Sequence, residues 1–183
     1  MLKFLFGNES MLKILIADDH PIFRQGLKQV LARESDLHVA GEAGNGREAL
    51  EEVTKQHYDV ILLDITMPGE SGLSIIRQLK QIDKDLSVLV LSMHPEEQYA
   101  VQALKAGAAA YLTKVSVPDE LVNAIRKVAN GGKYISSTLA EKLAYAIEEP
   151  QSGCPGEWND RRRVFVDFIS DEEPGGQVRP HRG

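Results

Sequence analysis

The stretch Tyr58-Asp59-Val60-Ile61-Leu62-Leu63-Asp64 decides the fold of this chain. It contains four consecutive branched apolar residues, Val60 to Leu63, followed directly by the carboxylate of Asp64. A continuous apolar run of this kind predicts a strand that is buried on both faces, as in a parallel sheet. Asp64 then lies at the carboxyl end of the strand, where open α/β sheets place their ligand sites. Considered alone, Asp64 fits a nucleophile or metal ligand as well as a helix cap or a solvated strand end.

A second apolar run, Leu12-Lys13-Ile14-Leu15-Ile16-Ala17, ends on the adjacent carboxylates Asp18 and Asp19. If the two strands are parallel neighbours, these acids and Asp64 meet at one edge of the sheet, where like charges repel. A hard divalent cation removes that repulsion, and Mg²⁺ suits the site because it binds a few carboxylates and leaves room for phosphate oxygens. Capping of a helix near Pro21 is the alternative for Asp18 and Asp19. Two adjacent acids together with Asp64 exceed what capping needs.

Two more predicted strands end on groups that complement this acidic edge. Residues 86–91 precede the hydroxyl of Ser92, and residues 109–113 precede the ammonium of Lys114. Each residue alone is more commonly a turn residue or a surface charge. Together with the acids, a hydroxyl donor and a cation suit a phosphoryl group carried on Asp64.

Apolar residues at helical spacing alternate with these strands along the chain. A short strand is expected at residues 38–43, and helices are expected to begin near residues 21, 47, 73, 96 and 118. This alternation predicts an α/β fold with a doubly wound, five-stranded parallel sheet and five helices. Right-handed crossovers then bring all the strand ends that carry polar residues to one edge.

The composition excludes several classes of protein. A chain of 183 residues with 43% hydrophobic content can form one ordinary domain with a short appendage. The net charge of −6 argues against a dedicated nucleic-acid surface. The single cysteine, Cys154, allows no internal disulfide and fits a reducing cytoplasm. No apolar run approaches the roughly 20 residues that span a bilayer, so no membrane partner is expected.

The two ends of the chain differ in character from its centre. Residues 1–10 are expected to be a leader, because their opening Met-Leu-Lys recurs at residue 11. A linker helix is expected within residues 131–149. Residues 150–183 are rich in proline and glycine and are predicted to be a disordered or non-native tail, with a strand at residues 164–169 as the alternative.

The order of these polar residues on successive strands resembles that of a response-regulator receiver domain from two-component signalling. The residues that carry the resemblance are Asp18, Asp19, Asp64, Ser92, Tyr111 and Lys114. The resemblance also rests on three specific stretches: Ala-Asp-Asp-His-Pro at 17–21, Leu-Asp-Ile-Thr-Met-Pro-Gly at 63–69 and Ala-Gly-Ala at 106–108. The resemblance covers about residues 11–130, is strongest to the NarL/LuxR subgroup and implies the flavodoxin-like (CheY-like) fold.

The resemblance implies a role for each matching residue. Asp64 would be the phosphoacceptor. Asp19 and Asp64 would hold Mg²⁺ through their side chains and Thr66 through its backbone carbonyl, while Asp18 would act mainly through a metal-bound water. Lys114 would pair with Asp64 and then with a phosphoryl oxygen.

Two further residues would form the switch. Ser92 would donate a hydrogen bond to the phosphoryl group, and its movement would let Tyr111 change rotamer. The implied function is that of a phosphorelay switch rather than an enzyme, phosphorylated by a sensor histidine kinase or a phosphotransfer protein in the cytoplasm. Pairing into a homodimer through the first and last helices is also implied. Val115 stands where the wider family often has a cis-proline, which implies a more mobile loop.

The chain departs from the subgroup after the receiver. NarL/LuxR regulators usually carry a helix-turn-helix domain, and residues 149–183 show no such periodicity. We therefore expect DNA contact only through an output domain that is missing here, with the tail interpreted as out-of-frame or vector-derived sequence after a truncated transcription regulator. A natural stand-alone receiver that acts through protein contacts is the alternative. A magnesium-dependent aspartyl phosphatase is disfavoured, because Thr66 stands where haloacid-dehalogenase-type phosphatases carry a second aspartate.

Overall fold

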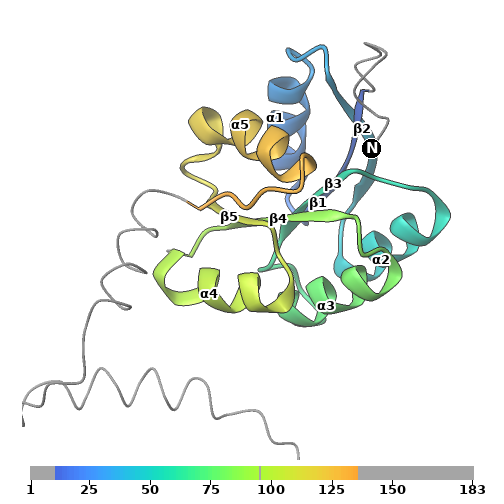
Figure 1. Ribbon diagram of the computed structural model, residues 1–183, viewed down its shortest axis with the longest axis vertical. Coiled ribbons are helices and arrows are strands. Elements are labelled where there is room, and N and C mark those ends of the chain that lie inside the picture. The colour runs from blue at the N-terminus through green and yellow to red at the C-terminus, as the bar shows by residue number, and fades with distance from the viewer. Residues whose placement is uncertain (1–10, 95, 136–183) are drawn as a thin grey trace, which may run out of the picture. The chain divides into compact units, whose positions relative to one another are not determined.

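A computed structural model describes residues 11–94 and 96–135 of the chain (Figure 1). In this part, five strands alternate with five helices, which confirms the predicted architecture. The strands are β1 (Leu12–Ala17), β2 (Leu37–Ala43), β3 (Val60–Asp64), β4 (Ser87–Ser92) and β5 (Ala110–Thr113). The helices are α1 (Pro21–Leu31), α2 (Gly46–Lys55), α3 (Gly72–Ile82), α4 (Glu96–Ala106) and α5 (Val117–Ala129).

The strands form one parallel sheet in the order β2-β1-β3-β4-β5. The chain runs outward from β1 to β2 and then returns to β3 on the other side of β1, so the strand order reverses between β1 and β3. Open α/β sheets bind their ligands beyond the carboxyl ends of the strands at such a reversal. Ala17 of β1 pairs with Leu63 of β3, which places Asp18 and Asp64 beside each other at this edge.

Strand β3 is the centre of the sheet and is buried on both faces. Its apolar residues, Val60 to Leu63, have no exposed surface. Because side chains alternate across a strand, Ile61 and Leu63 join one apolar cluster while Val60 and Leu62 join the other. The continuous apolar run therefore reflects two cores, one on each side of the sheet.

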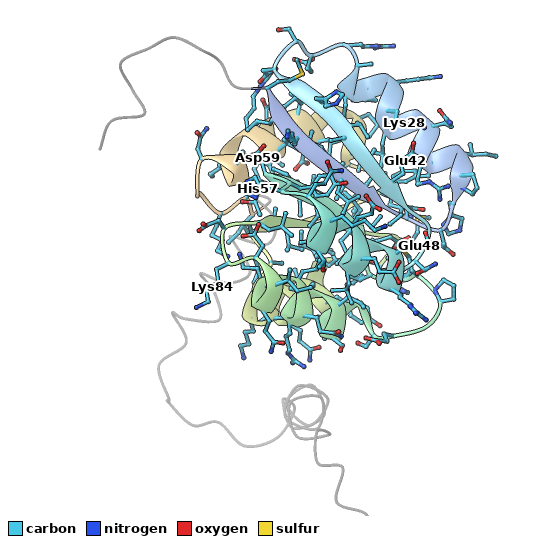
Figure 2. All side chains as sticks on the ribbon, turned by 90° about the vertical axis from the view of Figure 1, so that its right-hand side faces the viewer. Lys28, Glu42, Glu48, His57, Asp59 and Lys84 are labelled. Carbon is cyan, nitrogen blue, oxygen red and sulfur yellow. The ribbon has the colours of Figure 1, made fainter. Side chains whose placement is uncertain are left out.

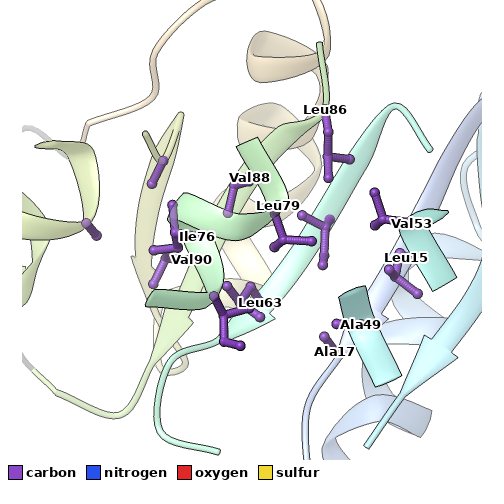
Figure 3. Close-up of a cluster of buried hydrophobic side chains, with 14 of the residues drawn as sticks. Leu15, Ala17, Ala49, Val53, Leu63, Ile76, Leu79, Leu86, Val88 and Val90 are labelled. Carbon is purple, nitrogen blue, oxygen red and sulfur yellow. The ribbon is translucent and has the colours of Figure 1, made fainter. Parts of the chain in front are cut away.

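Two layers of helices cover these cores (Figure 1). Helices α1 and α5 pack on one face, through residues such as Leu27 and Ile125. Helices α2, α3 and α4 pack on the other, through Val53, Ile76 and Ala103. Figure 3 shows part of this second cluster, with Ile76 among the side chains of the neighbouring strands. Together the layers hold the sheet rigid and leave its carboxyl edge for the polar residues.

Helix α1 begins without the side-chain cap that was the alternative role of the acids. Its N-cap residue is His20, whose side chain makes no capping hydrogen bond, and Pro21 occupies the first turn. Asp18 Oδ1 accepts a hydrogen bond from the backbone N–H of His20 at 2.7 Å, ahead of the helix. Arg24 of α1 donates through Nη1 to the backbone carbonyl of Asp18. Capping of α1 therefore does not describe what Asp18 does.

The chain leaves the last helix through a glycine turn. Gly131 has φ +79°, and Tyr134 then forms a parallel bridge with Ala110 of β5. Residues 131–135 are accordingly not helical, although they fall in the range predicted for the linker helix. The rest of that predicted helix, the leader and the tail lie outside the described residues. Within the described part, no helix combines the length and apolar character that crossing a membrane requires.

Candidate functional site

Asp64 is a buried carboxylate that its neighbours hold in one orientation. It ends β3, and the residue is 1% exposed. Its Oδ1 accepts hydrogen bonds from both the backbone N–H of Thr66, at 2.7 Å, and the Thr66 hydroxyl. Its Oδ2 accepts a hydrogen bond from Lys114 Nζ at 2.6 Å. The loop after β3 and the loop after β5 thus fix the two oxygens separately.

Lys114 supplies a positive charge to the site and forms ion pairs with two acids. Its Nζ lies 2.6 Å from Asp18 Oδ2 and 2.6 Å from Asp64 Oδ2. The ammonium also lies 4.5 Å from the centre of the Phe23 ring, within the range of a cation–π contact. Burial alone would lower the pKa of Lys114, but the hydrogen bonds to Asp18 and Asp64 outweigh it and raise the pKa above its usual value. Lys114 is therefore charged at neutral pH.

The acids at this edge form a group that can hold a metal ion. One ligand atom from each of Asp18, Asp19, His20 and Asp64 lies within 4.8 Å of all the others. Asp19 Oδ1 is buried and accepts no hydrogen bond, although His20 Nδ1 is only 2.9 Å away. The contact is an ion pair only when the imidazole is protonated, and it is not a hydrogen bond, because a hydrogen bond also requires the N–H to point at the oxygen. An unsatisfied carboxylate oxygen among further carboxylates fits the oxygen ligands that Mg²⁺ prefers.

The predicted switch residues meet at the loop between β4 and α4. Ser92 has no exposed surface, and its Oγ accepts a hydrogen bond from the backbone N–H of His94 at 3.0 Å. Tyr111 is also buried, and its hydroxyl donates to the backbone carbonyl of His94 at 3.1 Å. The Tyr111 ring thus points inward in this structure. Both side chains form hydrogen bonds with the backbone of His94, so a movement of Ser92 that shifts His94 can also change the position of Tyr111.

The structure brings together the acids and the lysine that the sequence singled out, and it adds neighbours that the sequence reasoning missed. The sequence reasoning treated His20 only as part of a motif. Its position directly after Asp19 could have indicated that its side chain lies near the acids. Phe23 is one of the apolar residues at helical spacing in α1. Nothing in the helical spacing indicated that its ring would also contact Lys114.

Known proteins resemble the chain in both sequence and structure. The family model for the response regulator receiver domain matches residues 14–126. The transcriptional regulatory protein DegU of Brevibacillus brevis is 43% identical over 136 residues, 74% of this chain and 58% of that protein. The response regulator UvrY of Escherichia coli strain K12 is 36% identical over 141 residues, 77% of this chain and 65% of that protein. The chain thus spans about three fifths of the length of these relatives.

Solved structures agree with these matches. A LuxR-family two-component response regulator from Aurantimonas sp. SI85-9A1 superposes with a TM-score of 0.71 at 34% identity, over 76% of this chain and 100% of that one. The receiver domain of NarL from Mycobacterium tuberculosis gives a TM-score of 0.63 at 36% identity, over 67% of this chain and 98% of that one. The chain belongs to the response-regulator receiver family of two-component signalling, and its relatives are regulators of the NarL/LuxR type.

Proposed function

We propose that this chain is a phosphoacceptor receiver in which Asp64 takes a phosphoryl group from a phosphohistidine of a sensor histidine kinase or phosphotransfer protein. The observation that carries the proposal is the fixed carboxylate of Asp64 with Lys114 Nζ at 2.6 Å. A nucleophile for phosphoryl transfer needs positioning and a nearby positive charge more than it needs a general base. Asp64 has both.

The transfer can be written from the residues of the site. A carboxylate oxygen of Asp64 attacks phosphorus in line, the P–N bond to the partner's histidine breaks, and the imidazole leaves with the bonding electron pair. Lys114 shifts from Asp64 Oδ2 onto a phosphoryl oxygen while Asp18 still holds it. Asp19, Asp64 and the Thr66 carbonyl would hold Mg²⁺, with Asp18 acting through a water, and the bound ion would supply positive charge to the phosphoryl oxygens.

The signal would leave the site through Ser92 and Tyr111. Turning the Ser92 hydroxyl toward a phosphoryl oxygen breaks its contact with the N–H of His94, which is 3.0 Å long here. The carbonyl of His94 accepts from Tyr111, so the β4–α4 loop and the tyrosine move together. Phosphorylation biases this pair of states only by as much as it stabilises one over the other. This is the behaviour of a switch rather than of an enzyme that turns over a substrate.

Intact-mass spectrometry after incubation with Mg²⁺ and acetyl phosphate tests the assignment. The wild-type chain should gain one phosphoryl group and Asp64→Asn none. Asp59→Asn is the matched control, because Asp59 directly precedes β3, at the end of the strand opposite Asp64, and lies beside His57 (Figure 2). Equal labelling of wild type and Asp64→Asn would refute the proposal.

The parent protein is proposed to be a cytoplasmic transcription regulator of the LuxR type. The support is the length of DegU and UvrY beyond the matched region. DNA contact would then belong to an output domain, and phosphorylation would promote pairing of two receivers. Reading the coding DNA in all three frames tests the first point, since a helix-turn-helix should follow in one of them. Analytical ultracentrifugation with and without acetyl phosphate tests the second, and a monomer under both conditions would contradict it.

A further inference from the structure

We propose that His20 is a nitrogen ligand of the metal site and that it gives this receiver a preference for first-row transition ions over Mg²⁺. The inference rests on the proposed function, because it concerns the metal site of the same phosphoacceptor. It assigns His20 a ligand role of its own at that site.

The first support is the close approach of the His20 ring nitrogen to two carboxylate oxygens. His20 Nδ1 lies 2.9 Å from Asp19 Oδ1 and 3.3 Å from Asp18 Oδ1. Adjacent ligands of an octahedral ion with bonds of about 2.1 Å are separated by about 3.0 Å. Asp19 Oδ1 is buried and accepts no hydrogen bond, and its contact with the ring is an ion pair only when the imidazole is protonated. A cation between them would satisfy both.

The second support is the way the chain fixes the backbone of His20 and leaves its ring adjustable. The backbone N–H donates to Asp18 Oδ1 at 2.7 Å, and Pro21 restricts His20 to the extended conformation that it adopts. The side chain is 64% exposed, so the ring can turn toward an ion at little cost. The ligand atom thus starts within 4.8 Å of the donor atoms of the three acids.

The chemistry of the ligand atoms determines which metal ions bind more tightly when His20 is present. Mg²⁺ takes oxygen ligands, so an added imidazole gives it little. Imidazole suits nickel, zinc and iron, and divalent affinities rise from Mn²⁺ toward Cu²⁺ at a mixed nitrogen and oxygen site. His20 should therefore tighten binding of Ni²⁺ or Zn²⁺ and leave that of Mg²⁺ nearly unchanged.

Isothermal titration calorimetry of the full chain with NiCl₂ and with MgCl₂ measures this directly, without reference to phosphorylation. In His20→Ala, Ni²⁺ affinity should fall by roughly tenfold or more. Even residues that only support metal ligands typically lower metal affinity by about 10- to 100-fold when they are mutated. Mg²⁺ affinity should remain the same within error. His57→Ala is the control, because His57 is also a surface histidine between two carboxylates, with 62% of its side chain exposed. Both affinities should be unchanged in that variant.

Equal Ni²⁺ affinity of wild type and His20→Ala would overturn the inference, as would an equal loss for both ions, which would mean that His20 only arranges the acids. A second measurement needs no variant. The ¹⁵N resonances of the wild-type His20 ring should shift on Zn²⁺ titration, and unshifted resonances at saturation would also overturn the inference. Failure of Asp64 to become phosphorylated, with the nickel-specific loss retained, would refute the proposed function and leave the ligand role standing.

Discussion

Replacing Lys114 by methionine should destabilise the protein strongly when divalent ions are absent. Asp18 and Asp64 are each 1% exposed, and the ammonium of Lys114 bridges them. Methionine has a similar length and can occupy the same space beside the Phe23 ring without the cation–π contact. The substitution therefore removes the charge and the two hydrogen bonds while it leaves most of the packing in place.

The expected loss is about 3 kcal/mol in the free energy of unfolding. Unit charges about 4 Å apart attract by about 4 kcal/mol at the effective dielectric constant of partly buried sites. Removing one partner of a buried pair typically costs about 3–5 kcal/mol, because the remaining charge stays buried without compensation. We take the lower end, since the carboxyl edge of the sheet can admit water. The raised pKa of Lys114 means that its contribution is complete below the pKa of an unfolded lysine, about 10.5, and is lost only as the pH rises through the higher folded pKa.

Urea unfolding followed by circular dichroism, in EDTA at pH 7.5, measures the loss. Addition of Mg²⁺ should recover more stability in Lys114→Met than in wild type, because an ion that binds only the folded state stabilises it by linkage. Lys55→Met is the control. Lys55 also pairs with a carboxylate, Glu52 at 2.9 Å, but its side chain is 63% exposed, so the unfolding midpoint should barely move. Equal stability of Lys114→Met and wild type in EDTA would refute the view that this lysine neutralises the buried acids.

Alanine should have opposite effects at two helical glycines. A Cβ at Gly46 would lie 2.7 Å from Ile75 Cδ1, so Gly46→Ala should lower the free energy of urea unfolding by about 1–3 kcal/mol. A Cβ at Gly26 meets nothing within 4 Å, so Gly26→Ala should raise it by about 0.5–1 kcal/mol. A stabilised Gly46→Ala would show that the core yields more easily than its packing indicates. Lys28 hydrogen-bonds Glu42 at 2.6 Å and is the main cause of the lowered pKa of Glu42 (Figure 2). The pair stabilises the fold above the unfolded pKa of the glutamate and loses its effect as the pH falls through the lower folded value. Lys28→Met should cost about 0.2–1 kcal/mol at pH 7 and raise the Glu42 pKa in carboxyl NMR titration, and an unshifted titration would contradict the pairing.

The sequence predicted the parts of this structure that depend on local pattern. The apolar run before Asp64 could be read as a strand buried on both faces because each of its residues is needed by one of two cores. Its polar end could be read as a site because the topology of parallel sheets sends strand ends to one edge. The same reasoning placed Asp18 and Lys114 beside Asp64, where the structure has them.

The sequence could not predict details that arise only when side chains from distant segments meet. Phe23 has the spacing of a core residue, and its contact with Lys114 depends on how the start of α1 meets the residue that follows β5. The inward position of Tyr111 depends on a hydrogen bond to a loop carbonyl, which no residue type encodes. Roles for such residues require coordinates, because orientation rather than identity decides them.

If Asp64 is phosphorylated as proposed, the shared position of Lys114 would let one cation serve both the resting and the phosphorylated states. Its distances to Asp18 Oδ2 and Asp64 Oδ2 are equal, 2.6 Å each. When Asp64 carries a phosphoryl group, the ammonium can follow the new negative charge while its pair with Asp18 stays intact. A lysine bound to Asp64 alone would have to give up its only partner first, and breaking a buried pair is costly. Asp18 therefore holds the lysine within reach of either charge, in addition to any part it takes in binding metal.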